Sequence, residues 1–372
     1  MEIRKIDTGN SKDTKKFIQF PFQLYNSNPF WVPPMINDMK FALNRNTHPF
    51  YKHSEADFFI VEEGSKVLGR VAAIDNNRYK KYSGNNSGFI YFFESINDTK
   101  VAKVLFETVF NWSRKRRLGQ IIGPKGLIQG DGLGLLVEGF QYKPAMGIPY
   151  NHEYYPELFE NSGFIKEVDY LSGYLTSDYE VSDQVHQLAD RVKSRRNMWV
   201  KEFASKDELR TWIPKIREVY NQAFTVVPGY VPITEDEVQL MAKRILSVAT
   251  PNLIKLIFKE DDLIGFLFSY HNISDGIQKS KGKMFPLGWY YLMQAFKNTK
   301  RVDINGIGLL PGHQGVGATA VLYNELEKSI RSYPFELADI VQIAETNLKS
   351  LGEAKKLGVK WHKRHRIYKR IL

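Results

Sequence analysis

The two halves of the chain repeat one order of structural elements, and this repetition limits the possible folds more than any other feature. Residues 58–74 show a pattern of two apolar strands joined by a tight Gly-Ser turn. Residues 253–270 repeat this hairpin pattern, and Gly265 stands where the first copy has Gly69. We therefore expect two domains that are built alike, because a duplicated pattern of this kind indicates a duplicated supersecondary unit.

The ends of the two halves support the same division. In each half a short helical pattern stops at a glycine, Gly163 or Gly358, and a strand pattern follows. At 372 residues the chain is long for a single core. We predict an N-terminal domain of residues 1–176 and a C-terminal domain of residues 177–372, with the polar stretch 176–183 as the linker.

Between these markers, each half predicts a strand, a long helix, a strand, a short helix and a final strand. In the first half these elements are residues 88–94, 98–117, 120–123, 152–161 and 165–175. In the second half they are residues 301–310, 314–331, 338–345, 347–357 and 360–371, after an opening helix at 185–193. A glycine-rich stretch at 123–134 has no helix start directly behind it, so a connecting loop is favoured there over a ligand-binding loop.

The junction between strand and helix at residues 309–326 carries the strongest chemical signal. Gly315 and Gly317 lack a Cβ, so the backbone there can approach an anion closely. The first N–H groups of the following helix then point at that anion, with the positive end of the helix dipole behind them. Neither the G-x-x-x-x-G-K-[ST] pattern nor the G-x-G-x-x-G pattern fits this stretch. The junction is either a pyrophosphate site of another kind or an ordinary turn with a flexible loop.

This junction resembles motif A of the GNAT acyltransferase superfamily, R/Q-x-x-G-x-G/A, with Gln314 and Gly317 in register and Thr319 departing at the last position. In that family the loop amides hold the pyrophosphate of acetyl-CoA or another acyl-CoA, so the resemblance implies this co-substrate. Asn347 matches the asparagine that often opens the next helix in the family, although helix capping explains it equally well. The cofactor-binding residues implied by the resemblance are Leu309, Leu310, Gln314, Gly315, Val316, Gly317, Ala318, Thr319 and Asn347.

The order of elements in both halves is also similar to that of GNAT domains, so the resemblance covers nearly the whole chain. It implies an α/β (α+β) fold of two tandem GNAT-like domains, each with a mixed, mostly antiparallel central sheet flanked by helices. The first half has Asn97 and Asp98 where the second half has its glycines. A carboxylate at that place repels phosphate, so the first domain is expected to be a diverged copy.

The resemblance also implies the chemistry. In a GNAT enzyme the acceptor amine attacks the thioester directly, which requires a base and a proton donor but no covalent nucleophile. The family's base, a carboxylate eleven residues ahead of the R/Q position, corresponds to Asp303, and Glu345 after the next strand is a second candidate. A solvent-facing strand residue is the other interpretation of Asp303. The tyrosine that serves as the acid in many relatives corresponds to Ala354 and is absent. An N-acyltransferase, specifically an N-acetyltransferase, is therefore expected, with a non-catalytic CoA-binding protein as the alternative.

The aromatic stretch 285–296, with Trp289, Tyr290 and Tyr291, has two interpretations. It lines an acceptor or acyl pocket, or it forms an amphipathic helix that covers the core. Periodicity favours the second.

Charge and composition bound the remaining possibilities. The net charge of +11, from 52 basic and 41 acidic residues, attracts anions such as CoA, and it alone supports the alternative of a nucleic-acid-associated protein. His362 and His365 have no carboxylate nearby in the sequence, so no metal is expected. No apolar run has the length of a membrane span, and neither a signal peptide nor a cysteine is present. We therefore expect a cytoplasmic protein without a membrane partner that acts on a small-molecule or peptide amine.

Overall fold

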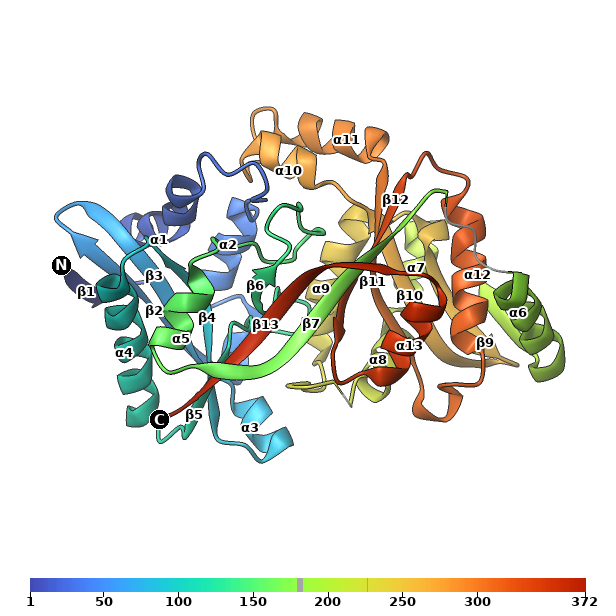
Figure 1. The fold of residues 1–372 in the computed structure, drawn as a ribbon, viewed down its shortest axis with the longest axis horizontal. Helices are drawn as coiled ribbons and strands as arrows, with labels where there is room; N and C mark the ends of the chain where they lie inside the picture. The colour runs from blue at the N-terminus through green and yellow to red at the C-terminus, as the bar shows by residue number, and fades with distance from the viewer. Residues whose placement is uncertain (179–182, 226) are drawn as a thin grey trace. The chain divides into compact units, whose positions relative to one another are not determined.

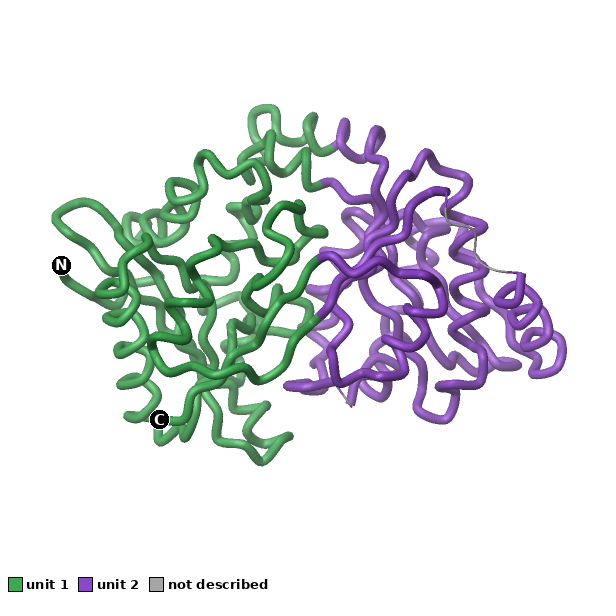
Figure 2. Tube along the Cα trace, viewed as in Figure 1, with its two compact units in different colours: residues 1–170, 274–292, 363–372 green, residues 171–273, 293–362 purple. Residues whose placement is uncertain are grey.

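The computed structural model describes residues 1–178, 183–225 and 227–372. These residues form two compact units (Figure 2). Unit 1 consists of Met1–Tyr170, Ser274–Leu292 and Lys363–Leu372, and unit 2 consists of Leu171–Ile273 and Met293–His362. Part of the predicted linker, residues 179–182, lies outside the described residues. The domain limits 1–176 and 177–372 stay a prediction.

Unit 1 is built on a mixed, mostly antiparallel sheet (Figure 1). Its strands pair in the order β1-β2-β3-β4-β5-β13, and β6 also pairs with β13. The β4–β5 pair is parallel, whereas the pairs of β1 with β2, β2 with β3, β3 with β4 and β13 with β5 and β6 are antiparallel. The last strand of the chain therefore completes the sheet of the N-terminal half. The strand bounds are β1 (Glu2–Lys5), β2 (Glu55–Glu63), β3 (Lys66–Asp75), β4 (Ser87–Ser95), β5 (Gln120–Gly123), β6 (Leu135–Glu138), β7 (Ile165–Thr176) and β13 (Lys360–Ile371).

The helices of unit 1 bury one apolar stripe each. In α4 the buried residues Val101, Leu105 and Val109 recur every four positions, so they lie on one face of the helix, against the buried side chains of β2 and β3. The helix bounds are α1 (Ser11–Leu24), α2 (Ile36–Leu43), η1 (Pro49–Lys52), α3 (Asn77–Ser83), α4 (Thr99–Lys115), α5 (Tyr155–Asn161), α10 (Ser274–Ser280) and the first part of α11 (Gly288–Asn298).

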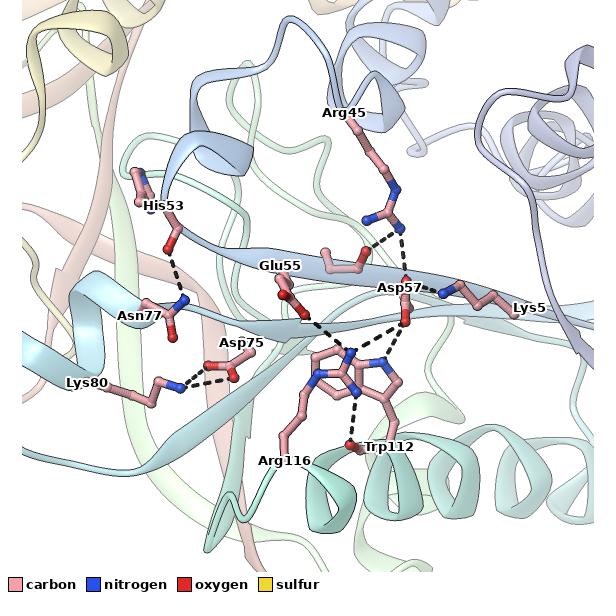
Figure 3. Close-up of polar contacts among 11 residues, drawn as sticks. Lys5, Arg45, His53, Glu55, Asp57, Asp75, Asn77, Lys80, Trp112 and Arg116 are labelled. Atoms are coloured by element: carbon pink, nitrogen blue, oxygen red, sulfur yellow. Dashed lines mark hydrogen bonds and ion pairs between the residues drawn. The ribbon is translucent and has the colours of Figure 1, made fainter.

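A buried carboxylate, Asp57 on β2, joins β1, α4 and the loop after α2 to the sheet (Figure 3). It accepts Lys5 Nζ at 2.8 Å, Arg45 Nη2 at 2.9 Å and Trp112 Nε1 at 2.8 Å, and Arg116 Nη2 lies 3.8 Å away. Burial acts to raise the pKa of Asp57, but the hydrogen bonds from Lys5 and Trp112 outweigh it, so this pKa is lowered. The charge is therefore retained inside the unit because it is fully paired.

Unit 2 has a sheet of the same type, with the strand order β7-β12-β11-β10-β9-β8. The β11–β12 pair is parallel, and β8 to β11 pair antiparallel with one another. Helices α12 and α6 cover one face of this sheet, and α7 and α8 cover the other. The bounds are α6 (Asp183–Arg196), β8 (Met198–Lys201), α7 (Lys206–Thr211), α8 (Ile213–Ala223), α9 (Glu235–Val248), η2 (Pro251–Leu253), β9 (Ile254–Lys259), β10 (Asp262–His271), β11 (Arg301–Leu309), η3 (Pro311–His313), α12 (Ala318–Ile330), β12 (Leu337–Ala344) and α13 (Leu348–Lys356).

The two units repeat the same local design. Gly69 pairs with Ser95 at the end of β4, and Gly265 pairs with Leu309 at the end of β11. A Cβ would lie 2.8 Å from Leu105 Cδ1 at Gly69 and 2.4 Å from Leu309 Cδ2 at Gly265, so both hairpins require a glycine for close packing. The predicted fold class is confirmed.

Candidate functional site

The junction between β11 and α12 has a backbone conformation that its glycines permit. After β11 ends at Leu309, α12 begins at Ala318. Gly315 and Gly317 have φ angles of +75° and +92°, in the left-handed region where a Cβ causes strain. Gly317 is the N-cap residue of α12, and it has no side chain that could accept from the first N–H groups of the helix. These N–H groups are thus available to an anionic ligand.

The surrounding packing holds the loop in this conformation. Val321 and Leu322 of α12 are buried in the core of unit 2. The Gln314 amide Nε2 donates to the carbonyl oxygen of Leu309 at 3.1 Å and closes the turn. A Cβ at Gly317 would lie 2.6 Å from Val192 Cγ2 on α6, so the helix start is pressed against a neighbouring helix. The loop is therefore tied to the end of β11 by Gln314 and packed against α6 at Gly317.

Strands β11 and β12 separate beside this loop. Their parallel pairing runs from Arg301 with Leu337 to Ile304 with Ile340. All residues of both strands are described, and the pairing between them ends at Ile304 and Ile340. β11 nevertheless continues to Leu309, and β12 continues to Ala344. The facing edges of the two strands are thus left without strand partners next to the helix N-terminus, which is where an extended ligand can hydrogen-bond to backbone groups.

The matching junction of unit 1 is closed by its own side chain. Asp98 is the N-cap residue of α4, and its carboxylate accepts the backbone N–H of Lys100 at 2.7 Å. The glycine-rich loop after β5 also binds its own carboxylate, because Asp131 accepts the N–H groups of Leu127 and Ile128 at 3.0 and 3.1 Å. In both places a carboxylate side chain of the protein therefore accepts the backbone N–H groups, whereas Gly317 at the start of α12 offers no such side chain.

Asp303 lies within β11 and is fully buried, so the solvent-facing interpretation is wrong. Both of its carboxylate oxygens accept Asn272 Nδ2 at 2.9 Å. Its neighbours in register are Tyr270 on β10 and Asp339 on β12, and residues paired in register point to the same face of a sheet. Burial, and next the charge of Asp303, raises the pKa of Tyr270, so this hydroxyl stays protonated beside the carboxylate.

Glu345 and Asn347 follow the carboxyl end of β12. Glu345 is partly exposed directly after the strand. Asn347 is the N-cap residue of α13, and its Oδ1 accepts the N–H of Ser350 at 3.1 Å. Because β11 and β12 run parallel, Glu345 lies at the same edge of the sheet as the glycine loop, whereas Asp303 lies deeper in the sheet.

Glu353 on α13 is an acidic residue close to this loop that the sequence patterns did not single out. Burial raises its pKa, opposed by a hydrogen bond from Thr319 in the first turn of α12. The pKa of Tyr323 is raised by its own burial and further by the charge of Glu353. Ala354, at the position of the family's tyrosine, is buried in the core. The only sequence signal for Glu353 was its place next to that position.

Helix α11 exposes the aromatic side chains at its start, whereas Phe296 near its end stacks on the buried His271 with the ring centroids 4.3 Å apart. Gly288 is its one buried residue, and Trp289 and Tyr290 are 49% and 42% exposed. The core-covering interpretation of residues 285–296 is therefore wrong for these aromatic side chains. Their role in an acceptor pocket stays a prediction.

The two histidines of the C-terminal strand contact protein groups. His362 Nε2 lies 4.0 Å from Asp339 Oδ2, and His365 Nε2 lies 3.0 Å from the carbonyl oxygen of Pro149. Within the described ranges, no three His, Cys, Asp or Glu side chains are grouped as metal ligands would be. None of the described helices has the length and apolar character of a membrane-crossing segment.

Two known proteins resemble the chain in sequence over nearly its whole length. No family model matches the chain. It is 25% identical to Protein YghO of Escherichia coli (strain K12) over 97% of this chain and 93% of that protein. It is also 25% identical to a bacterial ceramide synthase of Caulobacter vibrioides, over 100% of this chain and 98% of the relative.

Among solved structures, a tandem GNAT protein from the clavulanic acid biosynthesis pathway superimposes with a TM-score of 0.56 at 11% identity. The superposition covers 100% of this chain and 98% of the other. At this identity the likeness concerns the fold, and it confirms the resemblance noted in the sequence at that level. The chain has the fold of tandem GNAT proteins.

Proposed function

From this fold, which is that of known acyltransferases, we propose that the protein is an acyl-CoA-dependent N-acyltransferase whose acyl-CoA binds in unit 2. The observation that carries the proposal is the start of α12, where Gly317 leaves the first helical N–H groups without a capping side chain beside two separating parallel strands. The positive end of a helix dipole and free N–H groups suit a pyrophosphate. The edges of β11 and β12 suit the amide-bearing arm of CoA.

The acceptor that we propose is a long-chain amino alcohol, and the acyl group is a fatty acyl chain. This choice rests on the relative from Caulobacter vibrioides, which is named a bacterial ceramide synthase and aligns over the whole chain. A ceramide is the fatty amide of such an amino alcohol. The family motif instead implies acetyl transfer to a small amine. One assay tests this activity and the transfer of a fatty acyl group to a long-chain amino alcohol.

In the proposed reaction the amine nitrogen attacks the thioester carbonyl, the new C–N bond forms, and the C–S bond breaks. Before the attack, a carboxylate takes one proton from the ammonium group of the acceptor. The nitrogen loses a second proton as the amide forms, and this proton restores the acid that protonates the departing thiolate. Asp303 and Glu345 are our candidates for the base. Glu353 is our candidate for the acid in place of the absent tyrosine, because it directly precedes Ala354 on α13 and shares a hydrogen bond with Thr319 in the first turn of α12.

The test is turnover measured as release of free thiol, with the amide product identified by mass. Acetyl-CoA and a long-chain acyl-CoA are each offered with small amines, amino acids, peptides and sphinganine. We expect the long-chain acyl-CoA and sphinganine to react fastest. Turnover restricted to acetyl-CoA and small amines would contradict the acceptor that we propose, and failure to bind any acyl-CoA would contradict the proposed function as a whole.

A second candidate is a CoA-binding protein without catalysis. It is favoured by one observation, the buried alanine at position 354 where a catalytic hydroxyl is expected. Tight CoA binding without turnover of any acceptor in the same screen would select this candidate.

A further inference from the structure

The segment between β10 and β11 combines positive charge with exposed apolar side chains. Residues 276–302 contain no aspartate or glutamate. The basic residues of this stretch are Lys279, Lys281, Lys283, Lys297, Lys300 and Arg301. Lys279, Lys281 and Lys283 are exposed and, among the described residues, none of these three forms an ion pair. Their charge is therefore available to an external anionic partner.

The apolar part of the segment directly follows these lysines. Phe285 is 81% exposed, Leu287 is 54% exposed and Trp289 is 49% exposed, and Tyr290 follows with 42%. Large apolar side chains normally lie inside a protein, so a contiguous run of them at the surface indicates an interaction site. Trp and Tyr are also the residue types that favour the boundary between water and lipid.

Unit 1 holds the base of this segment firmly. The side-chain amide Nε2 of Gln278, on α10, donates to the carbonyl oxygens of Pro29 and Trp31 at 3.0 and 2.7 Å. The backbone N–H of Ile36, the first residue of α2, donates to the carbonyl oxygen of Gly282 at 2.9 Å. The exposed side chains are thus presented from a fixed base, and α10 and α11 are labelled in Figure 1.

We propose that residues 279–290, which we name the basic-aromatic segment, dock the protein onto an anionic lipid bilayer. Such a surface offers negative headgroups to the three lysines and an interface into which Phe285, Leu287 and Trp289 can insert. A second copy of the chain fits less well, because a two-fold contact would bring the same unpaired lysines together. The proposal replaces the sequence-based expectation of no membrane partner, which rested on the lack of an apolar run long enough to span a bilayer. Surface docking needs no membrane span, so it is compatible with the absence of a spanning segment among the described helices.

The test is co-sedimentation of the full chain with phosphatidylcholine vesicles that contain about one third phosphatidylglycerol, compared with phosphatidylcholine alone. We expect binding to the anionic vesicles, weakened by added salt. Each lysine near an anionic surface contributes about fivefold to partitioning, so the triple variant Lys279→Glu, Lys281→Glu, Lys283→Glu should bind at least about tenfold more weakly. Phe285→Ser with Trp289→Ser should also weaken binding by about tenfold.

Matched controls separate docking from general charge and apolarity. Lys100, Lys103 and Lys115 are exposed lysines of α4, and their joint change to glutamate alters the net charge equally. Trp199 on β8 is 45% exposed and Trp289 is 49% exposed, so Trp199→Ser is the control for Trp289→Ser alone, which is measured beside the double variant. We expect both controls to bind as the unaltered protein does, and unchanged melting temperatures exclude misfolding.

Two results would overturn the proposal. One is equal binding of the segment variants and the unaltered protein to anionic vesicles. The other is a lipid-independent dimer that Trp289→Ser dissociates, which would assign the segment to a second copy of the chain. The proposal does not depend on catalysis, since vesicle binding is measured without acyl-CoA, so it can fail or hold independently of the proposed function.

Discussion

Replacement of Gly317 tests both the loop geometry and the proposed CoA site. Its φ angle of +92° disfavours any residue with a Cβ, at a cost of about 1–2 kcal/mol. The new Cβ would also lie 2.6 Å from Val192 Cγ2 and 3.8 Å from Leu188 Cδ1, and overpacking of this kind costs about 1–3 kcal/mol. Gly317→Ala should therefore destabilise unit 2 by roughly 2–5 kcal/mol, and Gly317→Val by more.

Two other glycines of the same loop separate strain from clash. Gly315 has a φ of +75° but no atom within 4 Å of a built Cβ, so Gly315→Ala should cost only the strain, about 1–2 kcal/mol. Gly312 has neither a left-handed φ nor a neighbour within 4 Å, so Gly312→Ala should leave stability unchanged or slightly raised. The order of melting temperatures is thus fixed in advance.

The assay is thermal unfolding of each variant with and without CoA. A ligand at one hundred times its dissociation constant stabilises the folded state by about 2.7 kcal/mol, which is roughly 5–10 °C for a unit of this size. We expect this shift in the unaltered protein and in Gly312→Ala, and its loss in Gly317→Val. If Gly317→Val unfolds outright, Gly317→Ala combined with Val192→Ala removes the clash, and the strain at the left-handed φ should still displace the loop and reduce the CoA shift. A full CoA shift in a folded Gly317 variant would refute the assignment of the pyrophosphate to this helix start.

Three further predictions follow from single acidic residues. Asp303→Asn should lower kcat/KM by about 10²- to 10⁴-fold with the CoA shift intact, as expected for a base, and Glu345→Gln is its comparison; unchanged turnover would remove Asp303 from the mechanism. Burial raises the pKa of Glu353 above 4.5, so ionisation of this side chain opposes folding. In urea titrations, Glu353→Gln should therefore become more stable than the unaltered protein as the pH rises through that pKa, and the two should be equally stable below pH 4.5. Asp57→Ala should lose about 1–3 kcal/mol because Trp112 Nε1 loses its acceptor, whereas Asp57→Asn should lose less. The lowered pKa of Asp57 means that its contribution is present above pH 3.8 and disappears as pH falls through the folded-state pKa, which an acid titration of both variants checks.

Several individual strands of this structure could be predicted from the sequence. The predicted strand at 120–123 and strand at 360–371 have the bounds of β5 and β13, and the strand at 301–310 ends one residue beyond β11. Hydrophobic periodicity and glycine stops act over a few residues, so they are readable without the fold. The helix expected at 314–331 begins later, at Ala318, because the left-handed glycines that mark the motif also prevent helical geometry ahead of it.

Contacts between distant residues were beyond such patterns. Nothing in β13 indicates that its end pairs with β5, because strand patterns specify a face but no partner. Periodicity in α11 indicated an amphipathic helix, but it could not tell whether protein or solvent meets the apolar face. Glu353 is notable only through Thr319 on another helix, so it became a candidate only when α12 and α13 were placed together.

The two units also differ at the strand that precedes each junction, and this difference argues for a single CoA site. The shared register places Glu94 of β4 where β11 has Gly308, since Ser95 pairs with Gly69 as Leu309 pairs with Gly265. Glu94 accepts the hydroxyl groups of Tyr25 and Tyr155, both at 2.7 Å, and these tyrosines are fully buried. Unit 1 therefore fills the end of this strand with a side-chain network and the start of the next helix with Asp98. Unit 2 has glycine at both positions, which leaves backbone groups in place of side chains. A site for a large anionic co-substrate needs accessible backbone N–H groups more than it needs particular side chains. Glycines at these positions in unit 2 suit such a site, whereas the side chains at the same positions in unit 1 occupy it. We therefore expect unit 2 to bind the co-substrate and unit 1 to have a supporting role.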